Sequence, residues 1–360
     1  MDRAAGSPDA AVEGVQHPAG DHHVHLICPQ GTDPRETKIN GNMVPRSVVE
    51  AAVRPVQLAL EDSMRALVTT PDTKFGLQLK EAPDPVPSPD QVVIEVENAS
   101  LNHGDVAAAG RAKPDRVGGW DAAGIVVQAA ADGSGPKVGD RVVTTGLAGA
   151  WAEKRAVPVN ELAVVPDSVD LAVASALPIA GVTATRALHR SGDIAGKRVL
   201  ITGASGGVGR YAIQIAAQKG AHVVALARRG DGLAELGAQE VVSDLDGVQP
   251  VDVILENVGG PTLVQSWELL KPGGVLQSIG WTSMEPAVFP PYATVGEAKS
   301  LSPFTSGNKY GPDLEYLLKL VAEGKLKVDI GWRGSWTDFD EAAAALFGRQ
   351  VAGKAVLDVD

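Results

Sequence analysis

The stretch VLITGASGGVGRYAIQIAA, residues 199–217, decides the fold. Its β-branched apolar start ends at Gly203, further glycines stand at positions 206, 207 and 209, and apolar residues at helical spacing follow. A strand, a glycine turn and a helix in this order form the context of a dinucleotide-binding fingerprint. Bare backbone permits the tight turn and lets a pyrophosphate approach the free N–H groups that begin the helix. The stretch therefore predicts a nucleotide site rather than a plain strand-to-helix turn.

The next predicted strand, residues 221–226, indicates which nucleotide binds. It is followed by Arg228 and Arg229. A site that prefers NAD usually places Asp or Glu near this point to hold the ribose 2′-hydroxyl. Two guanidinium groups can instead grip a 2′-phosphate with paired hydrogen bonds. We therefore predict NADPH as the cofactor, with a solvated basic turn as the alternative interpretation.

Composition restricts the function classes. The 360 residues are 44% hydrophobic and 21% charged, with a formal net charge of -12. This predicts a globular protein, and the negative charge argues against nucleic acid or an anionic membrane as the main partner. No apolar stretch is long enough to cross a membrane, and the first residues lack the core of a signal peptide. We expect a cytoplasmic protein.

A single cysteine, Cys28, has a chemical consequence. It allows no intrachain disulfide, and it excludes every zinc site built from several cysteines. Cys28 and four nearby histidines do not match the ligand spacing of a closed zinc site. We therefore predict no metal. Residues 1–63 have no sustained periodicity, and we expect an N-terminal extension that is disordered or not native.

Two different patterns of predicted secondary structure follow the extension. Short strands separated by Gly/Pro turns predict a mostly β region up to residue 178. After Pro178, alternating strands and helices predict a doubly wound parallel sheet. Its five predicted strands lie near residues 199, 223, 241, 251–255 and 274–279, with helices between most of them. Helices are also predicted at 314–323 and 339–347, and a final strand at 354–357 could return to the first region.

The order of several motifs resembles the medium-chain dehydrogenase/reductase superfamily, in its zinc-independent quinone oxidoreductase branch. The resemblance covers residues 64–360. The motifs are RALV at 65–68, SLNHGD at 100–105, GWDAAG at 119–124, VGDRV at 138–142, ALPIAGVTATRAL at 176–188, GASGGVG at 203–209, ENVGG at 256–260 and GKAVL at 353–357.

This resemblance implies an α/β fold with two domains. A GroES-like, mostly β catalytic domain would comprise residues 64–178 and 320–360, and a Rossmann NADP-binding domain residues 179–319. The active site would lie between them. Relatives often form dimers through the Rossmann sheet, so the resemblance implies a homodimer.

Departures from the zinc-dependent relatives decide the expected chemistry. Where those proteins carry a cysteine ligand and a histidine ligand, this chain looks to have Asn102 and Trp120. Neither an amide nor an indole is a useful zinc ligand. An alcohol dehydrogenase mechanism needs a Lewis acid on the alkoxide and is not expected. Hydride transfer to an already electrophilic conjugated carbon needs none, and the protein mainly orients the reactants.

Three residues of the SLNHGD motif are the catalytic candidates. Asn102 could donate its amide hydrogens to the substrate or the nicotinamide ribose. His103 could donate a proton to the resulting enolate, or it is a hydrogen-bonded structural histidine. Asp105 is expected to orient the loop. No tyrosine stands near Asn102 to serve as a proton donor.

The cofactor-binding candidates come from the glycine turn, the ends of the predicted strands and positions that match the family. Thr183 matches a family position near the nicotinamide, and Phe304 would close over it or pack in the core. The full set is Thr183, Gly203, Ser205, Gly206, Gly207, Val208, Gly209, Arg228, Arg229, Asn257, Val258, Gly259, Ile279, Gly280 and Phe304.

We therefore expect an NADPH-dependent, zinc-independent oxidoreductase that reduces a quinone or an α,β-unsaturated carbonyl. Two alternatives remain open: an enoyl-thioester reductase of fatty-acid or polyketide metabolism, and a non-catalytic NADPH-binding redox sensor. The glycine turn does not separate them, because each needs the cofactor.

Overall fold

The computed structural model describes residues 38–39, 42–43, 63–296 and 298–360. Contacts divide the chain into two compact units, residues 1–58 and 59–360. In the first unit, β1 (Lys38–Ile39) pairs antiparallel with β2 (Asn42–Met43). Most of the predicted N-terminal extension, including Cys28 and its neighbouring histidines, lies outside the described residues. Every other element belongs to the second unit.

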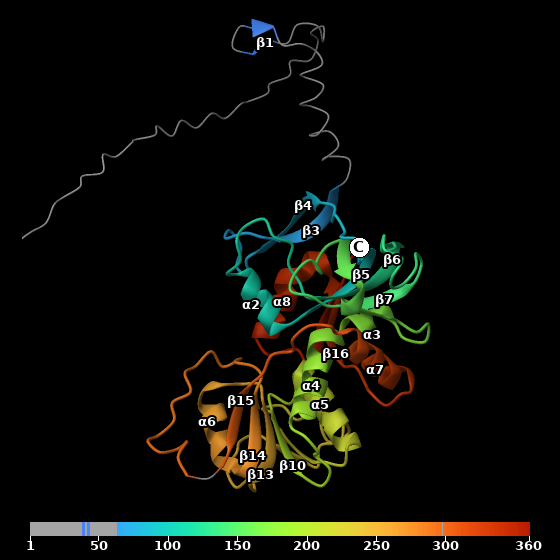
Figure 1. The fold of residues 1–360 in the computed structure, drawn as a ribbon. Coiled ribbons are helices and arrows are strands. Elements are labelled where there is room, and N and C mark those ends of the chain that lie inside the picture. Colours follow the sequence, from blue (N-terminus) through green and yellow to red (C-terminus); the bar gives the residue numbers. More distant parts are fainter. Residues whose placement is uncertain (1–37, 40–41, 44–62, 297) are drawn as a thin grey trace, which may run out of the picture. The chain divides into compact units, whose positions relative to one another are not determined.

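The strand before the glycine turn lies within a six-stranded sheet (Figure 1). All its neighbouring strands pair parallel, in the order β12-β11-β10-β13-β14-β15. This is the strand order of a dinucleotide-binding Rossmann sheet, so the doubly wound fold predicted from the sequence is confirmed. The strands are β10 (Arg198–Thr202), β11 (His222–Leu226), β12 (Glu240–Val242), β13 (Val251–Glu256), β14 (Leu270–Ser278) and β15 (Ser300–Pro303).

Helices cover both faces of this sheet. The alternation of side chains along β10 explains why: Val199 and Ile201 face one core cluster, which includes residues of α4, α5 and α7, whereas Leu200 faces another with Trp267 of α6. None of the described helices is long and apolar enough to cross a membrane. The helices are α4 (Pro178–Arg190), α5 (Gly207–Gln218), α6 (Gly260–Leu269) and α7 (Gly311–Ala322).

Two details of the predicted sheet were wrong. Helices fill only two of the four gaps between the five predicted strands, because turns alone connect β11 to β12 and β12 to β13. The first of these connections carries Gly230, Gly232 and Gly237, which do not favour a helix. The sequence analysis also missed β15, whose four residues, SLSP, are short and half polar.

The mostly β region contains a seven-stranded sheet in the order β16-β17-β5-β6-β7-β9, with β8 also paired to β5. The expected return of the C-terminus is confirmed, since β17 pairs antiparallel with β5. The strands are β5 (Gln91–Leu101), β6 (Asp121–Gln128), β7 (Arg141–Thr144), β8 (Lys154–Pro158), β9 (Leu162–Val164), β16 (Ile330–Ser335) and β17 (Lys354–Asp358).

A hairpin and short helices complete this region. A separate core contains Trp151, Trp336 and Phe339. The elements are β3 (Ser63–Thr69), β4 (Leu77–Pro83), α2 (His103–Ala109), α3 (Leu171–Ser175), α8 (Phe339–Phe347) and the 3-10 helices η1 (Val159–Glu161) and η2 (Trp336–Asp338).

Candidate active site

The glycine turn joins β10 to α5 with almost no side-chain volume. Gly203 has a φ of +59°, a left-handed conformation that favours glycine. A Cβ atom on Gly209 would lie 2.5 Å from the Cα atom of Ala204, so this position has no room for a side chain. Helix α5 begins at Gly207, and its N-cap residue Gly206 offers no side-chain cap, which leaves N–H groups of the first turn for a ligand. The turn fits the pyrophosphate of a dinucleotide.

A buried carboxylate organises the neighbouring turn, at the end of β13. Glu256 is fully buried, and its Oε1 accepts hydrogen bonds from the Thr202 hydroxyl at 2.9 Å and the Val258 N–H at 3.0 Å. Its Oε2 accepts the Gly259 N–H at 2.9 Å. The Thr202 Oγ1 also accepts the Asn257 N–H at 2.8 Å. These bonds join the carboxyl ends of β10 and β13, the edge where parallel sheets bind ligands.

Asn102 is the residue between β5 and α2, and we call this connection the Asn102 loop. Asp105 of α2 closes it. The Asn102 backbone N–H donates to Asp105 Oδ1 at 2.8 Å. The Asn102 side-chain amide donates to Asp105 Oδ2 at 3.1 Å and to Asp121 Oδ2 at 2.9 Å. Both amide hydrogens are therefore occupied within the protein.

Lys354 completes what we call the buried charge cluster: Asn102, Asp105, Asp121 and Lys354. The Lys354 Nζ donates to Asn102 Oδ1 at 2.6 Å and to the Leu101 carbonyl at 2.8 Å, and it lies 3.7 Å from Asp121 Oδ2. Asp105, Asp121 and Lys354 are at most 3% exposed. Two acidic side chains thus face one ammonium away from water, and buried charges are stable only when they have partners.

Asp121 also ties this cluster to α4. Its Oδ1 accepts the Thr145 hydroxyl at 2.8 Å, and the Ile179 N–H at the start of α4 points at both carboxylate oxygens at 3.3 Å. A carboxylate at a helix N-terminus is favoured by the helix dipole.

The buried charge cluster lies against the glycine turn. The Gly353 N–H donates to the Ser205 carbonyl at 3.0 Å, and Gly206 forms a parallel bridge with Gly353. A Cβ atom on Gly207 would lie 2.9 Å from Cδ of Lys354. The Asn102 loop and the nucleotide turn therefore form one continuous site.

Comparison with known proteins agrees with this arrangement. Residues 88–167 match the alcohol dehydrogenase GroES-like domain, and residues 234–357 match the zinc-binding dehydrogenase domain. The chain is 31% identical to the chloroplastic quinone-oxidoreductase homolog of Spinacia oleracea over 79% of its own length and 94% of that protein. The chain belongs to the quinone oxidoreductase-like branch of the medium-chain dehydrogenases/reductases.

Two further proteins resemble this chain, one in sequence and one in structure. It is 28% identical to the acryloyl-coenzyme A reductase of Sulfurisphaera tokodaii, over 82% of this chain and 99% of that protein. A solved mycobacterial structure complexed with NADPH superposes with a TM-score of 0.74 at 25% identity, over 82% of this chain and 100% of the other.

The residues at the family's zinc positions do not fit a zinc ion in this medium-chain reductase. The Asn102 amide is held between Asp105, Asp121 and Lys354, and the Trp120 indole offers no ligand atom. The same bonds change our interpretation of Asn102. Because its amide hydrogens are already used, we assign it to positioning rather than to donation toward a substrate.

His103 lies at the first position of α2, half-buried, with its ring edge-on to Phe347 at 5.6 Å between centroids. Burial and the positive charge of Lys354 lower the pKa of His103, against the opposing effect of a hydrogen bond to the Leu346 carbonyl. The imidazole is therefore neutral near pH 7, and its bond to Leu346 favours the structural interpretation over proton donation.

Asp105 is held by the Asn102 loop, as expected for a residue that orients it. Burial raises the pKa of Asp105 to about 7, with Asp121 adding to the effect and Lys354 and Asn102 opposing it. Burial also lowers the pKa of Lys354, although both aspartates oppose that change. The cluster thus takes up a proton near neutral pH.

The two arginines after β11 lie at the surface. The Arg229 guanidinium donates to the Arg349 carbonyl, and the Arg349 guanidinium donates to the Thr282 carbonyl at 3.2 Å. Arg228 makes no hydrogen bond or ion pair with the residues that the structure describes. Both side chains are thus exposed just after β11, and Arg349 adds a third cation that the sequence analysis did not select.

The remaining candidates fall into two groups. Asn257, Val258, Gly259, Ile279 and Gly280 lie together, since the Ile279 and Gly280 N–H groups both bind the Glu256 carbonyl. Thr183 is buried on α4, and Phe304 packs against the core with the Arg190 guanidinium 4.7 Å from its ring centroid. Phe304 is only half-buried, and its closure over the nicotinamide stays a prediction.

Sequence reasoning missed four residues that build the site. Asp121 and Lys354 form the charge cluster, and Thr202 and Glu256 form the turn between β10 and β13. Each stands within or beside an apolar strand segment, such as Lys354 in GKAVL. A charged residue in such a segment is a signal that it meets a buried partner.

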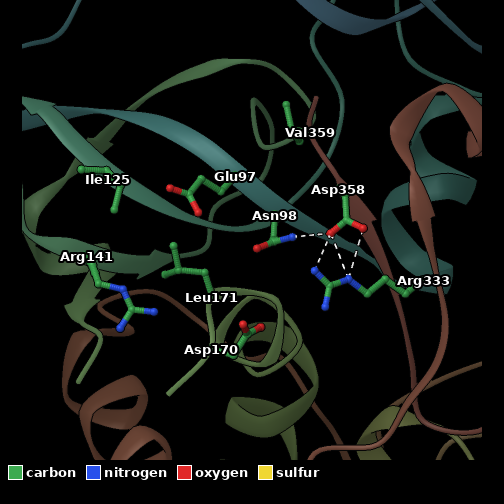
Figure 2. Close-up of a pocket in the computed structure, with 9 residues that line it drawn as sticks. All are labelled: Glu97, Asn98, Ile125, Arg141, Asp170, Leu171, Arg333, Asp358 and Val359. Atoms are coloured by element: carbon green, nitrogen blue, oxygen red, sulfur yellow. Dashed lines mark hydrogen bonds and ion pairs between the residues drawn. The ribbon is translucent and has the colours of Figure 1, made fainter. Parts of the chain in front are cut away.

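A separate cavity of about 430 Å³ opens on the seven-stranded sheet (Figure 2). Arg333 pairs with Asp358 in its wall, and Asn98 donates to the same carboxylate at 2.7 Å. It contains none of the predicted site residues, so we do not assign it to the active site. Its lining is Glu97, Asn98, Ile125, Arg141, Asp170, Leu171, Arg333, Asp358 and Val359.

Proposed function

We propose that this chain is an NADPH-dependent reductase of quinones or α,β-unsaturated carbonyls that works without zinc. The observation that carries the proposal is the direct contact between the nucleotide turn and the buried charge cluster, through Gly353 and Lys354. A nucleotide held by the turn would present its reactive end beside the Asn102 loop.

The proposed chemistry balances without a metal. When bound, the cofactor supplies a hydride, so that NADPH, a proton and a quinone become NADP⁺ and a hydroquinone. Conjugation places the developing negative charge on oxygen, where a hydrogen bond stabilises it. The chain's own residues hold the pyrophosphate at Gly203–Gly209, grip the 2′-phosphate with Arg228 and Arg229, and orient the Asn102 loop. Solvent delivers the proton.

An enoyl-thioester reductase is the second candidate. Its support is the similarity to an acryloyl-coenzyme A reductase over nearly the whole of that protein. The hydride step is the same, and only the carrier of the conjugated carbonyl differs.

One assay separates the candidates. The purified full chain is mixed with NADPH, and separately with NADH. Oxidation of the nucleotide is followed by its absorbance, with a small quinone, an enone or a crotonyl thioester as the acceptor. We expect faster turnover with NADPH, and with the quinone or enone above the thioester. Preference for the thioester would favour the second candidate. Tight NADPH binding without turnover would favour the redox-sensor alternative and overturn the proposal.

The choice of NADPH is tested at the two arginines. Arg228→Ala and Arg229→Ala should each raise the KM for NADPH, roughly tenfold for the loss of a charge-assisted contact, because the 2′-phosphate loses a guanidinium. The KM for NADH should stay unchanged. Equal effects on both nucleotides would show that these arginines do not read the 2′-phosphate.

The proposal also includes the cellular compartment, the domain division and the oligomeric state of the protein. One cysteine suits a reducing compartment such as the cytoplasm. We further propose the division into residues 64–178 with 320–360 and residues 179–319, and a homodimer as in many relatives. Sedimentation of the purified chain tests the dimer.

A further inference from the structure

Trp120 lies beside the Asn102 loop and has no part in the proposed function so far. It directly precedes β6, next to Asp121 of the buried charge cluster. Its ring packs on Gly104 in the first turn of α2: a Cβ atom on Gly104 would lie 2.6 Å from Cη2 of Trp120 and 2.8 Å from Cζ3. The ring can lie here only because position 104 has no side chain.

The backbone of Trp120 is firmly held. Its carbonyl accepts the Arg155 guanidinium at 2.9 Å and the Gly146 N–H at 3.1 Å. Arg155 is itself buried and donates to the Ala148 carbonyl at 3.0 Å. The preceding Gly119 has a φ of +85°, and a Cβ atom there would lie 2.4 Å from the Trp151 ring. The indole is thus carried by a rigid support, which a binding surface requires.

The indole N–H of Trp120 is a free donor. Four of the six tryptophans donate to backbone carbonyls, namely those of Ser100, Ala293, Glu285 and Asp360. The half-buried Trp120 makes no such bond with any described residue. The Asn102 amide hydrogens are occupied, and His103 is bonded to Leu346. On this side of the site, Trp120 thus offers a half-buried indole ring with an unused hydrogen.

These features match a flat conjugated ring that carries a carbonyl group. An aromatic acceptor gains from offset stacking on an indole face, and its oxygen accepts a hydrogen bond from the N–H. An acyclic thioester can accept the hydrogen bond but has no ring to stack. We propose that Trp120 contacts the substrate and selects ring-shaped quinones over acyclic enoyl thioesters. This inference rests on the proposed function and names its substrate class.

Two substitutions at Trp120 separate the ring from the hydrogen bond. The assay follows NADPH oxidation by the full chain with 1,4-naphthoquinone and with a crotonyl thioester. Trp120→Phe keeps an aromatic face and loses the donor, so kcat/KM should fall about fivefold for both acceptors, with their ratio unchanged. Trp120→Leu also loses the face, so the ratio of naphthoquinone to thioester should fall a further twofold to tenfold.

A second route displaces the ring and keeps the tryptophan. Gly104→Ala should push the indole away and lower the same ratio, whereas Gly110→Ala, at the end of the same helix with open space around it, should leave the ratio unchanged. Trp332→Leu is the matched tryptophan control, because its indole on β16 also makes no hydrogen bond with the described residues and lies outside the proposed site. Thermal melts check that each variant is folded.

The outcomes distinguish this inference from the proposed function. If the unmodified chain reduces naphthoquinone and Trp120→Leu and Gly104→Ala keep the original acceptor ratio, the role of Trp120 is overturned and the proposed function stands. If the unmodified chain oxidises NADPH with neither acceptor, the proposed function is overturned and this inference falls with it.

Discussion

Lys354 contacts both the Asn102 loop and the nucleotide turn. Its Nζ binds Asn102 Oδ1 at 2.6 Å, and its stem fills the space over Gly207. A buried ammonium is costly unless charges of the opposite sign compensate it, and Asp105 and Asp121 do so here. Removing the ammonium would take away the cation that Asp105 and Asp121 share.

We therefore expect Lys354→Met to lower the free energy of unfolding by roughly 3–5 kcal/mol, as for other broken buried ion pairs. Urea denaturation measures the change. Asp121→Asn in the same background should restore part of the loss, because it removes one of the uncompensated charges. A double-mutant cycle without coupling between positions 121 and 354 would contradict this account.

The nucleotide turn permits a second test at single residues. Gly209→Ala places a Cβ atom 2.5 Å from the backbone of Ala204, which cannot move away as a flexible side chain can. We expect a loss of roughly 1–3 kcal/mol in stability, and NADPH affinity at least tenfold weaker by calorimetry. Gly110→Ala meets nothing within 4 Å and should change stability by less than about 0.5 kcal/mol. Similar losses for both variants would show that the crowding at Gly209 is not the cause.

At the level of elements, the edge of the Rossmann sheet depends on two side chains that close the ends of β10 and β13. The Thr202 hydroxyl donates to Glu256 and accepts the N–H of Asn257. No cation among the described residues pairs with Glu256, and burial raises its pKa while its three hydrogen-bond donors oppose that effect. The turn that follows β13 is thus built around a carboxylate that hydrogen bonds alone stabilise.

Thr202→Val keeps the shape of the side chain and removes both bonds. We expect a loss of roughly 1–3 kcal/mol, because Glu256 and the Asn257 N–H are left without this partner in a buried place. Thermal unfolding measures it. Thr185→Val removes a hydroxyl that only caps a helix carbonyl, at 2.9 Å from Gly181, and should cost less than half as much. An equal cost at both positions would mean that the turn does not depend on Thr202.

The order of elements could be predicted because glycine turns and apolar periods are local signals. Residues 199–217 predicted the strand, turn and helix correctly, and the strand predicted at 354–357 pairs with β5 in the seven-stranded sheet. The pairing of Asp121 with Lys354 could not be predicted, since 233 positions separate two residues that meet only after β17 has paired with β5. Whether a side-chain donor is already used could not be predicted either, because the Asn102 side chain is bonded by Asp105, Asp121 and Lys354, and the last two are distant in the sequence.

On the scale of the whole molecule, the six-stranded and seven-stranded sheets are connected beside the buried charge cluster, and the protonation of this cluster affects stability. The Gly206–Gly353 bridge brings the nucleotide turn to β17, and the buried charge cluster lies beside that bridge. Asp105 is the group whose titration reports on this junction. Its pKa is raised to about 7 by burial, whereas its ordinary value is 3.8.

The sign of the resulting pH dependence follows from linkage. Between about pH 4 and pH 7 the folded state retains a proton on Asp105 that the unfolded chain releases, so the free energy of unfolding falls as pH rises through this window. The total change from this group is up to about 4 kcal/mol. His103 acts in the opposite direction, because its lowered pKa makes the unfolded state the better proton acceptor below about pH 6.5.

Asp105→Asn isolates the contribution of Asp105, since His103 is common to both proteins. Urea denaturation at pH 5, 6, 7 and 8 should show the difference in stability between Asp105→Asn and the unmodified chain moving in favour of the variant as pH rises, and levelling off above about pH 7. Asp167→Asn, an exposed position, should run parallel to the unmodified chain. A difference that stays constant from pH 5 to pH 8 would mean that Asp105 is ionised throughout, with Lys354 and the Asn102 hydrogen bonds outweighing its burial.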